Sequence, residues 1–324
     1  MGVLLRHTRN GGLTAWPSSC TARRAMIDVI VVGGGPAGLS AALMLGRCRR
    51  SVVVCDAGAP RNAASRALHG YTTRDGVAPA DFLRLAREEL TPYGVAYRRA
   101  RVAAVDRAAE RFDVRLAEGE SLACRKLLIA TGVEDDHPAL EGLRECYGLS
   151  VFHCPYCDGW EWRDRRLAIY GRGRAAAGLA LSLRTWSTDV ALLSGGPVRL
   201  PRSGRAVLHA EGVAIREEPI ARLHHADGRL QAVEFTSGGT LARDALFFTT
   251  GQHQQSAFAR SLGCEFTNRG TVRTNRHGQT CVPGLFVVGD ASFDVQFAVV
   301  AAAEGAKAAV AINREFQEEA GQRL

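Results

Sequence analysis

The chain of 324 residues is long enough for two domains, and its 46% hydrophobic and 23% charged content is ordinary for a packed, soluble protein. Residues 1–25 hold four arginines and no acidic residue, so only +4 of the net charge of +8 belongs to the rest of the chain. No basic stripe with interleaved aromatic residues is present, which argues against a nucleic acid partner. Nine cysteines without regular spacing are typical of a reducing compartment, so we expect a cytoplasmic protein.

The first 25 residues show no hydrophobic period, and Met26 leads directly into an apolar strand. We therefore expect this extension to lie outside the fold. Two interpretations remain open: a start codon assigned too early, and an arginine-rich organelle transit segment.

The next segment reads as a strand–helix–strand unit. Residues 27–32 are typical of a buried parallel strand, residues 36–46 of a helix, and residues 51–55 of a second strand. Three glycines interrupt the apolar stretch 29–46, so we expect no membrane span there.

The turn of this unit carries a dinucleotide-binding fingerprint, Gly33-Gly34-Gly35-Pro36-Ala37-Gly38. The glycines permit a tight turn, a close approach to a pyrophosphate and close packing of helix on strand. Asp56 follows the second strand, 21 residues beyond Gly35, where a carboxylate can accept hydrogen bonds from an adenosine ribose. Together these features indicate a nucleotide site.

The following stretch connects this unit to another buried strand. Arg61 and Asn62 lie in a loop, and a lone histidine, His69, is more often structural than functional. A helix is expected over 80–90. Segments 95–106 and 111–117 are expected to form a small inserted sheet. The strand 126–132 ends in the turn Ala130-Thr131-Gly132.

Two cysteines separated by two residues form the motif Cys154-Pro155-Tyr156-Cys157-Asp158-Gly159. Such a pair can close a small redox-active disulfide, and its first cysteine often has a lowered pKa. A zinc site of this type needs a second close pair of cysteines, which the chain lacks. The other alternative to a redox role is that both cysteines are buried, unreactive thiols. We expect a redox pair and no metal site.

A second strand–helix–strand unit follows, with strands at 166–170 and 189–193 around a helix that ends near Trp186. Its turn carries Gly171, Gly173 and Ala176 at fingerprint spacing. After the second strand the chain reads Ser-Gly-Gly-Pro, which is neither the acid typical of NAD sites nor the basic group typical of NADP sites. We expect nicotinamide binding at this turn, with no preference between NADH and NADPH.

The C-terminal part returns to strands at 213–223, 230–236 and 245–250. A further strand, 284–290, ends in Gly289-Asp290. An apolar helix with small residues along one side is expected over 296–316. Those small residues suit close packing, and the helix N-terminus suits stabilisation of an anionic flavin.

In order, these motifs resemble those of the low-molecular-weight thioredoxin reductases, a branch of the FAD-dependent pyridine nucleotide-disulfide oxidoreductases. The resemblance runs from Met26 to the C-terminus. It implies an α/β fold of two doubly wound Rossmann-like domains, the second inserted into the first. Residues 26–147 and 251–324 would bind FAD, and residues 148–250 would form an NAD(P)-binding-like domain that carries the cysteine pair.

The resemblance also implies roles for individual residues. Cys157 would face the flavin, Cys154 would exchange with substrate, and Asp158 would handle the thiolate proton. The FAD contacts it implies are Gly33, Gly35, Pro36, Ala37, Gly38, Asp56, Arg61, Asn62, Val102, Ala130, Thr131, Gly132, Gly289, Asp290, Gln296, Phe297 and Ala298. Of these, Gln296, Phe297 and Ala298 would lie at the pyrimidine edge of the flavin. Gly171, Gly173 and Ala176 would contact NADPH or NADH.

The implied activity is disulfide reduction, with a thioredoxin-like protein or a small-molecule disulfide as partner, in a homodimer. Two alternatives remain open. The flank of the cysteine pair also resembles the gliotoxin-type dithiol oxidases, which pass electrons to oxygen, although those tend to carry His where this chain has Asp158. The eroded second nucleotide site would also permit a redox sensor without turnover. Trp160 and Trp162 either shape a substrate pocket or pack the domain interface.

Overall fold

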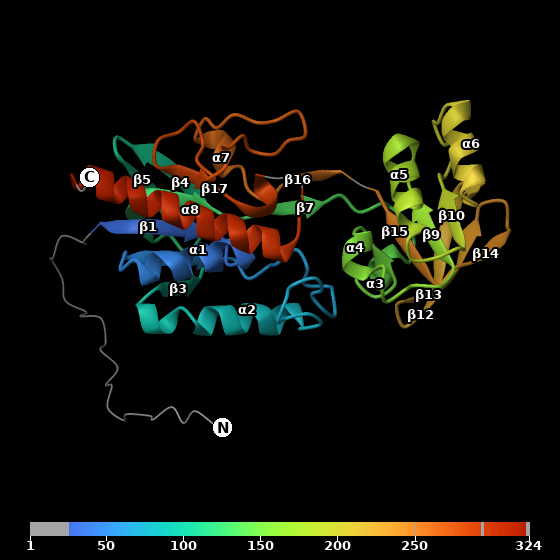
Figure 1. Ribbon diagram of the computed structural model, residues 1–324, viewed down its shortest axis with the longest axis horizontal. Helices are drawn as coiled ribbons and strands as arrows, with labels where there is room; N and C mark the ends of the chain where they lie inside the picture. The colour runs from blue at the N-terminus through green and yellow to red at the C-terminus, as the bar shows by residue number, and fades with distance from the viewer. Residues whose placement is uncertain (1–25, 250, 293–294, 322–324) are drawn as a thin grey trace, which may run out of the picture.

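The computed structural model describes residues 26–249, 251–292 and 295–321, and these form two α/β lobes that lie side by side (Figure 1). The predicted extension 1–25 and the end of the predicted strand at Thr250 lie outside the described residues. Among the described residues, no helix combines the length and the apolar character needed to cross a membrane.

The first lobe is built on a seven-stranded sheet. Its parallel strands are β1 (Ile27–Val32), β2 (Val52–Asp56), β3 (Ala96–Arg99), β6 (Ser121–Ile129) and β17 (Leu285–Val287). Two antiparallel strands extend the sheet beyond β6, namely β5 (Arg111–Leu116) and β4 (Val102–Ala108). The small inserted sheet predicted over 95–117 was wrong, because β3 pairs with β2 and the β4–β5 hairpin pairs with β6 in this one sheet.

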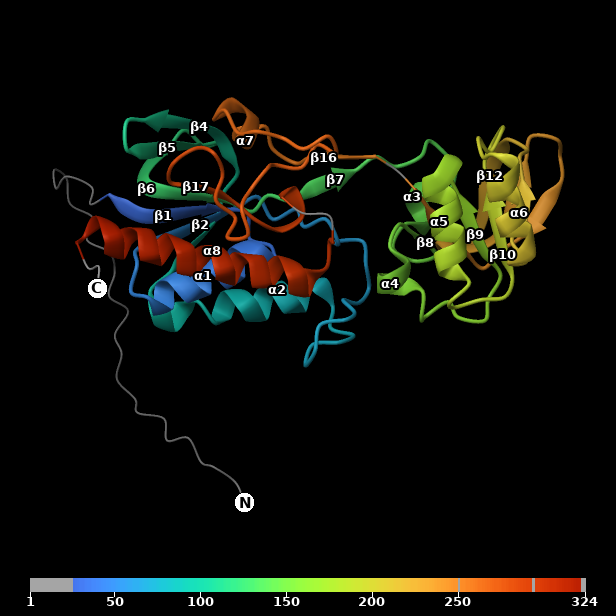
Figure 2. The ribbon, with the colours of Figure 1, turned by 45° about the horizontal axis from the view of Figure 1, so that its top comes forward.

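Helices α1 (Pro36–Arg47), α2 (Pro79–Glu88) and α8 (Ala298–Glu319) lie on one face of this sheet (Figure 2). Small residues let α1 and α8 touch, since a Cβ added at Gly305 would lie 2.0 Å from the carbonyl oxygen of Ala37. The short elements η1 (Thr91–Tyr93), α7 (Phe258–Ser261) and η2 (Gly289–Ala291) complete the lobe. The small-residue side of the C-terminal helix is thus a packing surface.

The second lobe has a parallel sheet in the order β11 (Ala214–Arg216), β10 (Val190–Leu193), β9 (Leu167–Tyr170), β15 (Ala245–Phe248) and β8 (Val151–Phe152). Its helices are α3 (Leu143–Cys146), α4 (Pro155–Asp158), α5 (Gly173–Leu183) and α6 (Arg202–Ala210). A separate antiparallel sheet contains β12 (Ile220–Ala226), β13 (Arg229–Phe235) and β14 (Thr240–Ala242). Strand β10 has only buried residues, as a central parallel strand requires.

The chain crosses between the lobes at β7 (Val133–Asp135) and β16 (Gln252–Gln254), which pair antiparallel. Leu143 and Cys146 pack with Leu223 in the core of the second lobe, so we place the first crossing before Leu140 rather than at the predicted 147/148 boundary. The second lobe is therefore inserted between β7 and β16. This arrangement confirms the predicted α/β fold of two Rossmann-like domains.

Candidate active site

The glycine-rich turn between β1 and α1 leaves an open cradle at the start of a helix. Gly33 has a φ of +111°, and a Cβ there would lie 2.3 Å from the Ala130 carbonyl oxygen, so only glycine suits this turn. No side chain caps α1 at Gly35, and a Cβ built at Gly35 would have open space within 4 Å. The free N–H groups of this helix end are suited to a phosphate.

Asp56 ends β2 beside the same turn. A Cβ at Gly34 would lie 2.6 Å from its carboxyl group, and the Tyr97 hydroxyl donates to Asp56 Oδ2 at 2.5 Å. Burial, together with the hydrogen bond to Asp56, raises the pKa of Tyr97 to about 12. The carboxylate is thus fixed next to the open helix end, and the pair fits the ribose and pyrophosphate of the ADP half of FAD.

Other predicted contacts lie along the same sheet edge. Ala130, Thr131 and Gly132 directly follow β6, and Gly132 has a φ of +72° that favours glycine. Thr131 Oγ1 lies 3.0 Å from Ser256 Oγ. The side chain of Val102 packs in the core of the first lobe, so only its backbone is free to meet a ligand.

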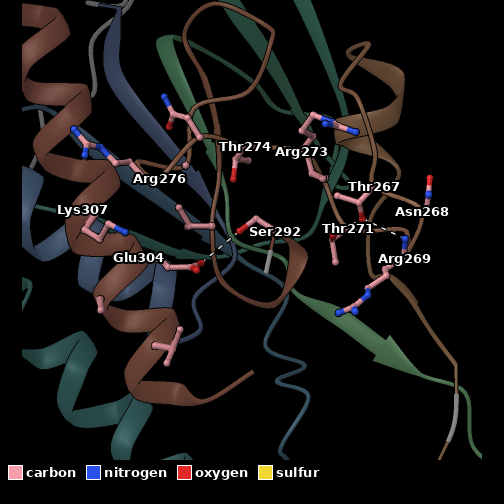
Figure 3. A pocket seen from close by; sticks show the side chains of 16 residues that line it. Thr267, Asn268, Arg269, Thr271, Arg273, Thr274, Arg276, Ser292, Glu304 and Lys307 are labelled. Atoms are coloured by element: carbon pink, nitrogen blue, oxygen red, sulfur yellow. Dashed lines mark hydrogen bonds between the residues drawn. The ribbon is translucent and has the colours of Figure 1, made fainter. Parts of the chain in front are cut away.

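Gly289 and Asp290 begin η2 and are fixed by Glu304 of α8. The Gly289 N–H donates to Glu304 Oε2 at 2.7 Å, and the Ser292 hydroxyl donates to the same oxygen at 3.4 Å (Figure 3). Burial raises the pKa of Glu304, which these hydrogen bonds oppose. Glu304 also lines a hollow of about 870 Å³ beside residues 267–278. Its role here is to position the Gly-Asp turn.

The cysteine pair forms a disulfide at the start of α4, with Cys154 as the N-cap residue. The N–H of Cys157 donates to Cys154 Sγ at 3.2 Å. Between them, Tyr156 is 69% exposed, and its ring centroid lies 6.2 Å from that of Phe297 at the N-terminus of α8. The loop of the disulfide therefore contacts a residue that the sequence predicts at the flavin edge.

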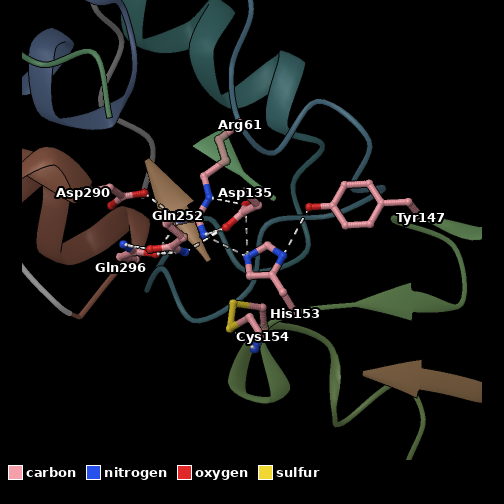
Figure 4. The surroundings of a disulfide bond; sticks show 9 residues. Arg61, Asp135, Tyr147, His153, Cys154, Gln252, Asp290 and Gln296 are labelled. Carbon is pink, nitrogen blue, oxygen red and sulfur yellow. Dashed lines mark hydrogen bonds and ion pairs between the residues drawn. A yellow bond between two sulfur atoms is a disulfide. The ribbon is translucent and has the colours of Figure 1, made fainter. Parts of the chain in front are cut away.

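Arg61 joins the predicted flavin-edge residues to the loop of the disulfide (Figure 4). Its guanidinium donates to both carboxylate oxygens of Asp135 at 2.7 Å, to Asp290 Oδ2 at 2.9 Å and to Gln296 Oε1 at 2.7 Å. It also lies 3.2 Å from Nε2 of His153. One cation thus connects both lobes.

The two carboxylates that contact Arg61 differ in their pKa shifts. Burial opposes ionisation of Asp135, but the hydrogen bond from Arg61 and nearby charges outweigh it and lower the pKa of Asp135. Burial raises the pKa of Asp290, and Arg61 only partly offsets this. Asp135 is therefore the carboxylate that Arg61 stabilises more strongly, through two hydrogen bonds against one to Asp290.

Asp158 follows Cys157 and lines a hollow of about 510 Å³ between the lobes, together with His69 and Glu161. Burial raises the pKa of Asp158 to about 7; Glu161 adds to this shift and His69 opposes it. Both protonation states are therefore populated near neutral pH, which suits a group that donates or accepts protons. His69, expected to be structural, lies 3.5 Å from carboxylate oxygens of Asp75 and Glu161.

The two tryptophans after the cysteine pair differ in their surroundings. Trp162 packs against Phe152, with ring centroids 6.1 Å apart. Trp160 is 64% exposed, and the guanidinium of Arg163 lies 4.1 Å from its ring centroid. Trp162 is a packing residue, whereas Trp160 offers an aromatic face to solvent near the disulfide.

The second fingerprint turn, between β9 and α5, is covered by its own chain. Arg172 Nε donates to the Ser194 carbonyl at 2.7 Å, and its Nη2 donates to the Gly195 carbonyl. The N–H of Gly173 donates to the Val198 carbonyl at 2.8 Å, while Ala176 is fully buried. The end of β10 carries no carboxylate, and one N–H of this turn, that of Gly173, is already used within the chain.

Sequence reasoning missed several residues of this site, namely Asp135, Tyr147, His153 and Gln252. Asp135 lies in a three-residue strand and Gln252 in the strand that pairs with it. Neither position belongs to a motif. His153 had one usable signal, its place directly before Cys154. Asn62 lies in a turn, where its carbonyl accepts the Ser65 N–H.

Within the ranges that the structure describes, no cluster of three His, Cys, Asp or Glu side chains is arranged to hold a metal ion.

Comparison with known proteins agrees with this geometry. The sequence profile of the pyridine nucleotide-disulphide oxidoreductases matches residues 27–305. A probable thioredoxin reductase of Arthroderma benhamiae is 31% identical over 326 residues, covering 90% of this chain and 81% of the relative. The crystal structure of HlmI superposes with a TM-score of 0.89 at 38% identity, covering 94% of this chain and 96% of HlmI.

A putative thioredoxin reductase TrxB from Bacillus anthracis gives a TM-score of 0.86 at 32% identity, covering 90% of this chain and 99% of TrxB. The matched region includes both glycine-rich turns and the cysteine pair. The chain belongs to the pyridine nucleotide-disulphide oxidoreductase family and is an FAD-dependent thiol–disulfide oxidoreductase.

Proposed function

We propose that this enzyme oxidises small apolar dithiols to disulfides and that FAD, bound by the first lobe, receives their electrons through Cys154 and Cys157. The observation that carries the proposal is the contact of the cysteine loop with the predicted flavin edge, through Tyr156 and Phe297. A dithiol and a flavin each exchange two electrons, so this proximity suits direct transfer.

The direction of electron flow is inferred from the second nucleotide turn. The Val198 carbonyl accepts the Gly173 N–H of this turn, and Arg172 donates to carbonyls of the loop after β10. Ser194 stands where an NAD site has an acid. Without a nicotinamide nucleotide at this turn, the substrate dithiol is the remaining electron source. The family as a whole uses FAD with NAD(P)H, so this chain is proposed as a departure from that pattern.

Two thiol–disulfide exchange steps are proposed to move the electrons from the substrate to the enzyme. A substrate thiolate attacks Cys154 Sγ, the Cys154–Cys157 bond breaks, and Cys157 leaves as a thiolate. The second substrate thiol then displaces Cys154, so the substrate departs as a disulfide and the enzyme holds two electrons as a dithiol. FAD held by the first lobe would supply the two-electron acceptor for the enzyme dithiol, and dioxygen would be the final oxidant, reduced to hydrogen peroxide.

Asp158 is proposed to accept the proton of the incoming thiol. Its pKa of about 7 leaves it largely ionised only above neutral pH. Cys157 is proposed as the thiol nearer the flavin and Cys154 as the exchanging thiol, following the family order. The predicted FAD contacts on the first lobe stand as part of this proposal.

The substrate class is inferred from the surface beside the disulfide. Tyr156 and Trp160 are both largely exposed, and Val295 and Val299 are exposed beside Phe297. An apolar or aromatic body bearing two thiols suits such a surface better than a highly charged one. Six further cysteines of the described chain are free thiols, which fits a cytoplasmic enzyme, and family resemblance suggests a homodimer.

A second candidate function, NAD(P)H-dependent reduction of a disulfide on a thioredoxin-like protein or small molecule, is favoured by Asp158. An acid with a raised pKa can protonate a leaving thiolate, as a reductase requires. The relatives named thioredoxin reductases point the same way.

Anaerobic stopped-flow absorbance of the FAD-loaded enzyme separates these candidates. The protein is mixed separately with dithiothreitol, NADPH and NADH. We expect dithiothreitol to bleach the flavin and oxygen to restore it, with no bleaching by either nucleotide. Fast bleaching by NADPH or NADH would overturn the oxidase proposal in favour of the reductase. In Cys157→Ser, flavin should stay bound while bleaching by dithiothreitol is lost.

A further inference from the structure

His153 lies between the two lobes, directly before the redox pair. Its Nδ1 lies 3.2 Å from the hydroxyl of Tyr147, in its own lobe, and its Nε2 lies 3.2 Å from Arg61 Nη2, in the first lobe. Figure 4 shows the ring above the disulfide with Arg61 on its far side. His153 is therefore a direct link from the cysteine loop to Arg61, which also contacts Asp290 and Gln296.

The hydrogen-bond chemistry fixes the protonation state of the ring. A guanidinium only donates, so Nε2 of His153 must be the acceptor and cannot carry a proton. The proton of the neutral ring then lies on Nδ1 and is donated to the Tyr147 oxygen. A second proton, on Nε2, would remove the acceptor and place two cations 3.2 Å apart.

The groups that face the ring favour this neutral state. Burial lowers the pKa of His153, and Arg61 and His137 act in the same direction, while the carboxylate of Asp135 opposes them from 4.0 Å. Burial also raises the pKa of Tyr147 to about 12, so its hydroxyl stays neutral, with Asp135 and Asp158 adding to the shift and Arg61 opposing it. Asp290 faces the other side of Arg61.

We propose that His153 is a positioning residue for the redox pair: its neutral imidazole ties the Cys154 loop to Arg61 of the first lobe and sets the approach of the disulfide to the flavin edge. The inference rests on the proposed transfer of electrons from Cys154 and Cys157 to FAD. Because the two ends of the link belong to different lobes, losing it frees the loop without removing any reacting group.

A set of three variants tests this role. In His153→Gln the amide oxygen reaches the place of Nε2 and can accept from Arg61, whereas His153→Asn reaches only the place of Nδ1. His153→Phe keeps the ring but neither nitrogen. His137→Phe is the matched control, since His137 packs on Tyr147 at 4.2 Å between ring centroids and is exposed.

The readout is the anaerobic rate of flavin bleaching by dithiothreitol in the FAD-loaded enzyme. A misplacement of about 1 Å can cost about 100-fold in rate, so we expect His153→Asn and His153→Phe to be slower by about 10- to 100-fold. His153→Gln and His137→Phe should stay near the wild-type rate at pH 8. Equal rates for all four variants would overturn the inference.

The pH profile gives a signature that a merely structural residue would not produce. In the wild type, the link exists above the pKa of His153 and is lost as the pH falls through it, at a pH below 6.5. Asp158 and dithiothreitol ionise alike in the wild type and in His153→Gln, so we expect the ratio of the wild-type bleaching rate to the His153→Gln rate to fall there. A ratio that stays constant as the pH falls through this range would overturn the role of the neutral imidazole.

A measurement on flavin-free protein completes the test. Amide hydrogen exchange over residues 150–158 should be faster in His153→Asn and His153→Phe than in His153→Gln. Unchanged exchange in all variants would count against the link. If dithiothreitol fails to bleach even the wild type, the proposed function fails, and the exchange experiment still decides the role of His153.

Discussion

The two strand–helix–strand units of this protein carry the same glycine pattern but differ in what surrounds it. Both α1 and α5 begin with no side-chain cap and with open space at the second glycine, Gly35 or Gly173, but only the first unit has an acid, Asp56, at the end of the neighbouring strand. In the second unit, the N–H of Gly173 is used by Val198, and Arg172 covers the end of β10. One unit is open to a nucleotide and the other is closed by its own chain.

This difference shows that the glycines alone do not make a nucleotide site. They allow the chain to turn and the helix to pack on the sheet, and both units use them in that way. Whether a ligand binds depends on the residue at the end of the second strand and on the loop that follows it. The segment from Ser194 to Val198 folds back on the turn, whereas Asp56 stays beside the open helix end.

The largest expected effect comes from substitution at the last residue of each fingerprint, Gly38 in the first unit and Ala176 in the second. A Cβ at Gly38 would lie 2.0 Å from the Gly33 carbonyl oxygen, whereas Ala176 already carries a Cβ at the same place in the second unit. Gly38→Ala should therefore lower the free energy of unfolding by about 3 kcal/mol and release the flavin, because overpacking distorts the turn.

Ala176→Gly is the matched change and should cost only about 1 kcal/mol, without loss of flavin. Denaturant unfolding and the flavin absorbance of the purified proteins measure both effects. Equal flavin loss in the two variants would mean that the units are not functionally different.

The second prediction concerns the direction of electron flow that a closed second unit implies. If electrons enter from a thiol, Asp158 works as a base and must be ionised. Its pKa of about 7 then makes the wild-type rate of flavin bleaching by dithiothreitol rise between about pH 6 and 8. Asp158→Asn should be slower by about 100-fold above pH 7, the usual scale of general base catalysis.

The ionisation of dithiothreitol itself raises the rate with pH in both proteins, so the ratio of wild type to Asp158→Asn isolates the carboxyl group. A ratio that falls as the pH rises through 7 would identify Asp158 as an acid. That outcome would support the reductase direction. It would also mean that the covered second turn does not imply an oxidase.

The fold and the outer parts of the site were largely predictable from sequence. Buried strands, glycine turns and the cysteine pair each carry a local pattern, and the two-domain fold followed from their order. The separate sheet over 95–117 was predicted wrongly because pairing partners are not encoded within a strand: β3 pairs with β2, more than 40 residues earlier in the chain.

The interior of the site was not predictable for a related reason. Arg61, Asp135 and His153 lie far apart in the sequence. They meet only because β7 and the loop of the disulfide, which leads into α4, come together at the junction of the lobes. The covering of the second turn was predictable only in part. The sequence shows that Ser194 stands in place of an acid, but it does not show that the Arg172 side chain donates to the Ser194 and Gly195 carbonyl groups.

The smallest expected effect is a gain, and it tests whether the closed unit can be opened. Arg172→Ala removes the side chain that covers the end of β10, and Ser194→Asp adds the carboxylate that an NAD site requires. A charged hydrogen bond to a ribose contributes about 1.5–3 kcal/mol, so the double variant should bind NADH at least about tenfold more tightly than the wild type.

Arg174→Ala is the control: it removes a charge from the same turn, where its side chain is exposed, and should leave the affinity for NADH unchanged. Titration calorimetry with NADH measures the three proteins. Tight NADH binding by the wild type would show that Arg172 moves aside without cost, and the contrast between an open and a closed unit would then be a feature of the ligand-free state alone.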